Sequence, residues 1–126
     1  MSKPRNFKLF ITDILDAIRN IKEYTKDMNF DKFSTDKKTI DAVIRNLEII
    51  GEAVKNIPTD IKMKHSKISW NLITGMRDKL IHEYFGVSIQ IVWETVINDL
   101  PIFESQIKSF EKSNEISFSA KNNEKD

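Results

Sequence analysis

Arg77, His82 and Tyr84 fall within eight residues of one another, in a chain that has only two histidines and two tyrosines. An imidazole can accept or donate a proton near neutral pH, and a guanidinium carries a permanent positive charge. Asp78 precedes His82 by four residues. On a helix its carboxylate can therefore hydrogen-bond the imidazole, fix its tautomer and leave the other ring nitrogen available. These residue types could carry out acid–base chemistry at His82.

Judged by spacing alone, an ordinary helix with a scattered polar face is the better interpretation of this cluster. At about 3.6 residues per turn, Arg77 and His82 diverge by about 140°, whereas Arg77 and Tyr84 lie nearly in line. The sequence contains no HExxH, GxGxxG, Walker or Gly-x-Ser-x-Gly motif. Two histidines and no cysteine also make a poor metal site, so no metal or cofactor is expected in this chain.

The elements that must position the cluster are helices. Glycine and proline occur only three times each, and apolar residues recur at spacings of three and four. The pattern predicts four long helices, at residues 5–27, 36–57, 70–85 and 89–110. We expect a loop at Met28–Ser34 and about one helical turn within residues 58–68. Expected end signals are N-caps at Asp36, Ser69 and Ser88, a stop at Pro58 and a kink at Pro101.

These elements predict an all-α domain, an up-down bundle of four long helices plus a short one. The bundle should occupy residues 1–111, and the polar segment 112–126 should be a disordered tail. The core of the bundle is expected to include the aromatic residues Phe7, Phe10, Trp70, Trp93, Phe103 and Phe110.

The charge balance allows nucleic-acid contact only through a local patch. Twenty basic against nineteen acidic residues give a net charge of +1, without the excess typical of nucleic-acid-binding domains. Lys62, Lys64 and Lys67 form one candidate RNA-binding patch, although a solvated charged loop is the more ordinary interpretation. His65 lies in the same basic segment, residues 58–68, and is expected to be solvated.

Composition also suggests a compartment. The absence of cysteine excludes disulfides and suits a reducing cytoplasm. No run of eighteen apolar residues predicts a membrane span, and the charges at Asp13 and Asp16 argue against a signal peptide.

The motif Arg-x4-His-x-Tyr at residues 77–84 resembles the signature of HEPN-domain proteins. The surrounding stretches LEIIGEAVKNIP (47–58), WNLITGMRDKLIHEYFGV (70–87) and VWETVINDLPIF (92–103) narrow the resemblance to the HepT-like branch. It covers nearly all of residues 5–110 in the expected order.

The resemblance implies a HEPN-like helical bundle that forms a homodimer, with the motif beside a cleft at the interface. Several HepT-like proteins are metal-independent toxin ribonucleases paired with an MntA-type nucleotidyltransferase antitoxin. That antitoxin uses ATP to transfer AMP onto the motif tyrosine and so silences the toxin. By position, Arg77 and His82 would be catalytic, Asp78 supporting and Tyr84 the modified residue. A non-catalytic HEPN subunit that binds and regulates a nucleotidyltransferase is the alternative function.

Overall fold

The computed structural model describes residues 6–71 and 88–125, with backbone only from residue 114 onward. Most of the predicted third long helix lies outside these residues. So do Arg77, Asp78, His82 and Tyr84, whose roles stay predictions.

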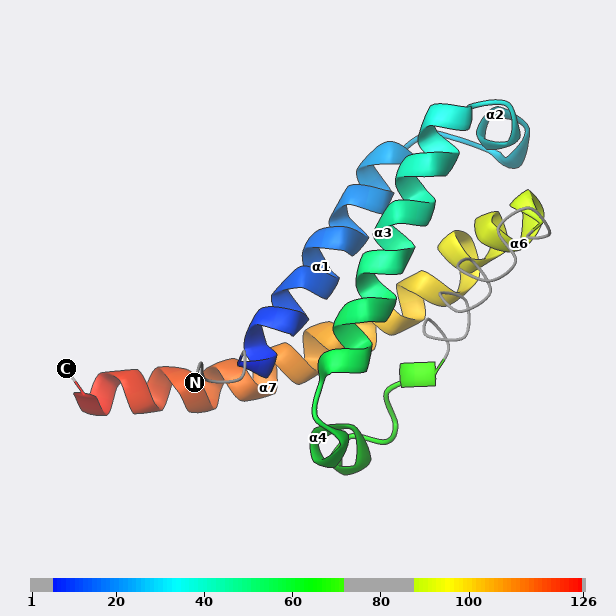
Figure 1. The fold of residues 1–126 in the computed structure, drawn as a ribbon. Helices are drawn as coiled ribbons and strands as arrows, with labels where there is room; N and C mark the ends of the chain where they lie inside the picture. The colour runs from blue at the N-terminus through cyan, green and yellow to red at the C-terminus, as the bar shows by residue number, and fades with distance from the viewer. Residues whose placement is uncertain (1–5, 72–87, 126) are drawn as a thin grey trace, which may run out of the picture.

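All elements in the described part of the chain are helical, which confirms the all-α class. They are α1 (Phe7–Tyr24), α2 (Phe30–Ser34), α3 (Lys37–Asn56), α4 (Thr59–Lys64), α6 (Ile89–Glu94), the π-helix η2 (Thr95–Asp99) and α7 (Leu100–Lys125). Helices α1 and α3 lie side by side and antiparallel, and the continuous run from α6 through η2 to α7 crosses them (Figure 1). Helix α4 lies at the end of the α1–α3 pair opposite α2.

Helix α3 begins at the predicted cap. The Asp36 carboxylate accepts a hydrogen bond from the Thr39 backbone N–H at 3.1 Å, and the helix ends at Asn56, shortly before Pro58. Hydrogen bonds from Thr39 stabilise the charged carboxylate and lower the pKa of Asp36 below its ordinary value of 3.8.

Replacing Asp36 by alanine should lower the melting temperature at pH 6, because an orphan backbone N–H of the first turn loses its acceptor. The folded-state pKa lies below 3.8, so the carboxylate's contribution is complete above that value and is lost as pH falls through the folded-state pKa. The difference in melting temperature between Asp36→Ala and wild type should therefore become smaller from pH 6 to pH 3, in thermal melts followed by circular dichroism. Asp36→Asn keeps a neutral capping oxygen and should show no such narrowing. Equal melting of Asp36→Ala and wild type at pH 6 would contradict the assignment.

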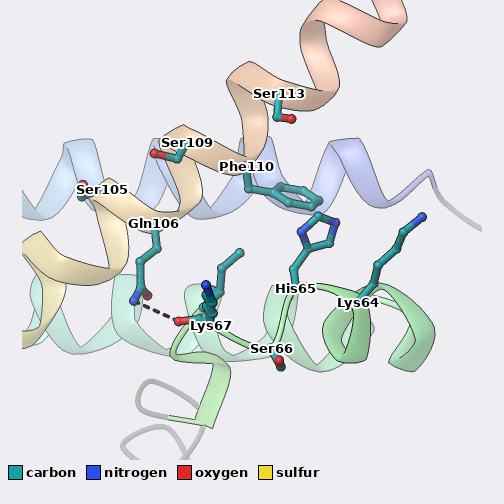
Figure 2. A pocket seen from close by; sticks show the side chains of 10 residues that line it. Lys64, His65, Ser66, Lys67, Ser105, Gln106, Ser109, Phe110 and Ser113 are labelled. Atoms are coloured by element: carbon teal, nitrogen blue, oxygen red, sulfur yellow. Dashed lines mark hydrogen bonds between the residues drawn. The ribbon is translucent and has the colours of Figure 1, made fainter.

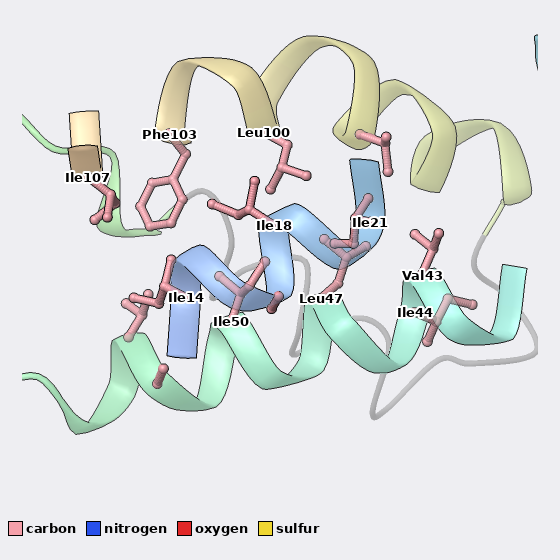
Figure 3. Close-up of a cluster of buried hydrophobic side chains, with 14 of the residues drawn as sticks. Ile14, Ile18, Ile21, Val43, Ile44, Leu47, Ile50, Leu100, Phe103 and Ile107 are labelled. Carbon is pink, nitrogen blue, oxygen red and sulfur yellow. The ribbon is translucent and has the colours of Figure 1, made fainter. Parts of the chain in front are cut away.

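The core forms where three helical faces meet (Figure 3). Helices α1 and α3 pack along their lengths, and the α6–α7 run closes over them. The buried side chains labelled in Figure 3 are Ile14, Ile18, Ile21, Val43, Ile44, Leu47, Ile50, Leu100, Phe103 and Ile107. Trp70, Phe103 and Phe110 are buried as predicted, whereas Phe7, Phe10 and Trp93 are partly buried against this core.

The loop prediction for Met28–Ser34 was wrong, because this segment contains α2. The Asn29 side chain accepts a hydrogen bond from the Lys32 backbone N–H at 2.9 Å, which caps the helix. Phe33 is completely buried, and its ring centroid lies 4.9 Å from that of Trp93. Burial of this one aromatic ring against a distant residue stabilises a helix too short to be stable alone.

The last helix carries its distortion just before Pro101. Ser88 caps α6 as predicted, accepting a hydrogen bond from the Gln90 backbone N–H at 3.1 Å. The Leu100 N–H bonds to the Thr95 carbonyl, five residues back, so the turn is widened into η2. Because proline has no N–H and its ring crowds the preceding turn, a widened turn is a physically reasonable adjustment at this place.

Helix α7 continues to Lys125, so the backbone is helical where the sequence suggested an irregular tail. The division into a domain at 1–111 and a tail at 112–126 stays a prediction. None of the helices in the described ranges is long and apolar enough to cross a membrane.

Candidate nucleic-acid interface

Residues 58–69 form a basic connector between α3 and the predicted motif helix at 70–85. The connector is held in a defined fold. Its backbone turns after α4 at His65, whose N–H donates to the Ile61 carbonyl at 3.0 Å. The His65 carbonyl in turn accepts the Ile68 N–H and the Trp70 indole N–H, each at 3.1 Å. Since Trp70 is buried, these hydrogen bonds fix the connector to the core.

Gln106 of α7 attaches the same connector from the other side. Its Oε1 accepts the Ser69 backbone N–H at 2.9 Å, and its Nε2 donates to the Lys67 carbonyl at 3.3 Å (Figure 2). One amide thus satisfies two backbone groups that no helix pairs in this segment. Sequence reasoning did not single out Gln106, because its partners lie 37 and 39 residues away in the chain.

A cavity of about 570 Å³ lies between this connector and α7 (Figure 2). Its volume is in the range of about 300–1,000 Å³ that is common for ligand sites. The lining residues are Lys64, His65, Ser66, Lys67, Ile68, Ser105, Gln106, Ser109, Phe110 and Ser113. Cations from the connector and hydroxyl groups from α7 therefore share one hollow.

The three lysines singled out in the sequence do not all share this cavity. Lys64 and Lys67 line it, whereas Lys62 lines a neighbouring hollow of about 570 Å³ together with Trp70 and Asn71. Within the described part of the chain, none of the three forms an ion pair with a carboxylate. Their contact with RNA stays a prediction.

His65 was expected to be a solvated loop residue, but it is only partly exposed. The side chain is half-buried, and its ring packs edge-on against Phe110 with the centroids 4.6 Å apart at an angle of 84°. Phe110 is only 6% exposed and also contacts Phe7 at a centroid distance of 6.1 Å. The C-terminal end of α4 meets α7 here, which explains how a histidine in a basic loop becomes part of a cavity wall.

Sequence reasoning also missed the serines of α7. Ser105, Ser109 and Ser113 are spaced by four residues, so they follow one face of the helix, and all three line the cavity. The spacing was visible in the sequence, but only the fold shows that this face lies opposite the basic connector.

The described residues contain no group of three or more histidine, cysteine, aspartate or glutamate side chains placed to hold a metal ion. Arg77, Asp78, His82 and Tyr84 follow the connector directly in sequence, at six to thirteen residues beyond Asn71.

Comparison with known proteins identifies the family. The profile described as "Ribonuclease HepT-like" matches residues 14–110. A Thermococcus cleftensis protein named "Probable ribonuclease HepT" is 48% identical over 108 residues, covering 86% of this chain and 98% of its own. "Putative RNase MJ0127" from Methanocaldococcus jannaschii is 46% identical over 108 residues, covering 86% and 87%. "Putative RNase TTE0752" from Caldanaerobacter subterraneus is 46% identical over 108 residues, covering 86% and 94%.

No solved structure gives a significant match to the chain. The family profile covers most of the chain, and each of these relatives aligns over nearly its whole length, so this protein belongs to the HepT-like ribonuclease family.

Proposed function

We propose that this chain is a toxin ribonuclease that cleaves RNA without a metal ion, as a homodimer, and that a partner nucleotidyltransferase silences it. The proposal depends on one observation above all. An uninterrupted Arg77-x4-His82-x-Tyr84 motif lies inside the region that matches a family described as ribonucleases. The names of the relatives support RNA as the substrate class.

Metal-free cleavage needs a group that removes a proton, a group that stabilises developing negative charge and a group that donates a proton, and the motif contains residue types for these roles. The 2′-hydroxyl of the ribose loses a proton and its oxygen attacks the adjacent phosphorus. The bond to the 5′-oxygen then breaks, and that oxygen takes up a proton, leaving a cyclic phosphate. His82 is assigned the proton transfer, and Arg77 the charge that develops on the non-bridging oxygens. Asp78 is assigned the orientation of the imidazole.

A homodimer completes this chemistry. One chain contributes a single motif histidine, while proton removal and proton donation call for two groups. A two-fold axis would bring two copies of the cluster to one cleft and would accommodate the divergence of about 140° between Arg77 and His82 on a helix. Paired arginines would also concentrate positive charge that the near-neutral chain lacks overall.

Tyr84 is assigned the switch. Its phenolic oxygen would attack the α-phosphorus of ATP in the active site of the partner, forming a phosphodiester to AMP and releasing pyrophosphate. The attached AMP adds bulk and negative charge, which would repel an RNA phosphate from the neighbouring Arg77. Lys62, Lys64 and Lys67 are assigned contacts with the RNA backbone.

Expression in a growing host tests the assignment of toxin and switch. The wild-type chain alone should arrest growth, and co-expression with a nucleotidyltransferase encoded beside it should restore growth. Peptide mass spectrometry should then place adenylyl groups on Tyr84. Tyr84→Phe should still arrest growth when the nucleotidyltransferase is co-expressed. Tyr24→Phe, at the chain's other tyrosine, should behave like wild type.

Two results would contradict the proposal. An adenylyl group at another residue, or none, would remove the role of Tyr84. Absence of growth arrest together with stable binding of the nucleotidyltransferase would instead favour the non-catalytic regulatory subunit.

A further inference from the structure

The cavity between the basic connector and α7 is cationic although the chain as a whole is nearly neutral. Among the residues that the structure describes, its lining contains Lys64, His65 and Lys67 and no aspartate or glutamate. The acidic residue next to Ser105 on α7, Glu104, is occupied by Lys22 at 3.3 Å and Lys108 at 3.4 Å. No described residue of its wall therefore neutralises the positive charge of the cavity.

The donors in this cavity are of the kinds that bind phosphate oxygens. Lysine ammonium groups form charge-assisted hydrogen bonds, and serine hydroxyls add directional neutral ones. Lys64, Lys67, Ser109 and Ser113 all line the cavity and are exposed. Among the described residues the ring nitrogens of His65 form no hydrogen bond, so the imidazole has a further donor or acceptor to offer.

The aromatic ring in the cavity argues for phosphate rather than base recognition. Single-stranded nucleic acid is usually gripped by stacking bases on exposed aromatic faces. Phe110 is only 6% exposed, with His65 edge-on against it and Phe7 nearby, so it offers no open face. A ligand here would be held by its charge and its oxygens.

We infer that this cavity is a phosphate subsite, in which Lys64, Lys67, Ser109 and Ser113 hold one phosphodiester group of an RNA strand outside the cleavage site. The inference rests on RNA being the substrate, as proposed above. Gln106 positions the subsite, because its two hydrogen bonds fix the connector that carries Lys67 against the helix that carries the serines. Since no base is read, binding at this place is independent of RNA sequence.

The test is binding of a fluorescent 2′-O-methyl RNA oligonucleotide, which lacks the attacking hydroxyl and so separates binding from cleavage. Lys64→Ala/Lys67→Ala should raise the Kd roughly tenfold, as loss of charge-assisted hydrogen bonds predicts. The slope of log K against log salt should become shallower by about 0.7, the value for one single-strand phosphate. The loss should be equal for uridine-rich and adenosine-rich oligonucleotides.

Three further proteins sharpen the result. Lys26→Ala/Lys32→Ala removes the same charge from two exposed positions, Lys26 before α2 and Lys32 within it, at the other end of the molecule, and should bind like wild type. Ser109→Ala/Ser113→Ala should weaken binding a few-fold without changing the salt slope. Lys64→Arg/Lys67→Arg should retain most of the affinity.

The outcomes separate this inference from the proposed function. Equal binding by wild type and Lys64→Ala/Lys67→Ala would overturn the subsite and leave the nuclease proposal standing. If the double substitution weakened binding to only one of the two oligonucleotides, uridine-rich or adenosine-rich, phosphate recognition would be overturned. If AMP bound the cavity more tightly than RNA, in calorimetry with the same proteins, a free nucleotide would replace the RNA strand as ligand. If wild type bound no RNA at all, both the subsite and the RNA substrate would fail.

Discussion

The His82→Ala protein should cleave RNA about 10²- to 10⁴-fold more slowly than wild type, the range for loss of a positioned acid or base. The assay uses purified protein and a labelled RNA in the presence of EDTA, so that any cleavage by wild type is independent of divalent metal. Added imidazole should restore part of the rate, because it can replace the missing proton-transfer group. The cleavage rate of Arg77→Ala should be about 10²- to 10³-fold lower than that of wild type, as expected when one preorganised donor to a developing charge is removed.

Arg45→Ala provides the matched control for loss of a guanidinium. Arg45 is exposed on α3, among the described residues it forms no ion pair, and its replacement should leave the rate unchanged. Wild-type rates for both His82→Ala and Arg77→Ala would remove the catalytic assignment. A wild-type rate that disappears in EDTA and returns with magnesium would remove metal independence while leaving RNA as the substrate.

The largest loss of stability should come from Phe103→Ala. Phe103 is completely buried between the α1–α3 pair and the connector, with its ring centroid 6.4 Å from that of Trp70. Truncating a buried phenylalanine costs about 3–5 kcal/mol, through lost transfer free energy and the cavity left behind. The free energy of unfolding of a typical domain is only about 5–15 kcal/mol, so the melting temperature should fall by roughly 10–20 °C.

Ile102→Ala is the control at the neighbouring position of the same helix. Ile102 is 55% exposed, so its truncation should change stability by no more than about 0.5 kcal/mol. Thermal melts of the two variants, measured side by side, should therefore differ widely. Similar melting of both would mean that α7 does not pack on the core through Phe103.

The sequence by itself determined the parts of this protein that depend on local patterns. Apolar periodicity placed α1 and α3 within two or three residues of their observed ends, and Asp36 and Ser88 were recognisable caps. These features need only neighbouring residues, because a helix is defined by contacts within four positions. The roles of Arg77 and His82 came from the resemblance of their motif to a known family, and they stay predictions.

Only the tertiary structure decided the features that depend on distant contacts. Helix α2 exists because Phe33 is buried against Trp93, sixty residues away in the chain. His65 becomes half-buried because Phe110 of α7 reaches it. Lys64 and Lys67 share a hollow with the serines of α7 because Gln106 holds the two segments together. Each of these outcomes depends on a packing free energy between segments that are far apart in sequence, which no local pattern encodes.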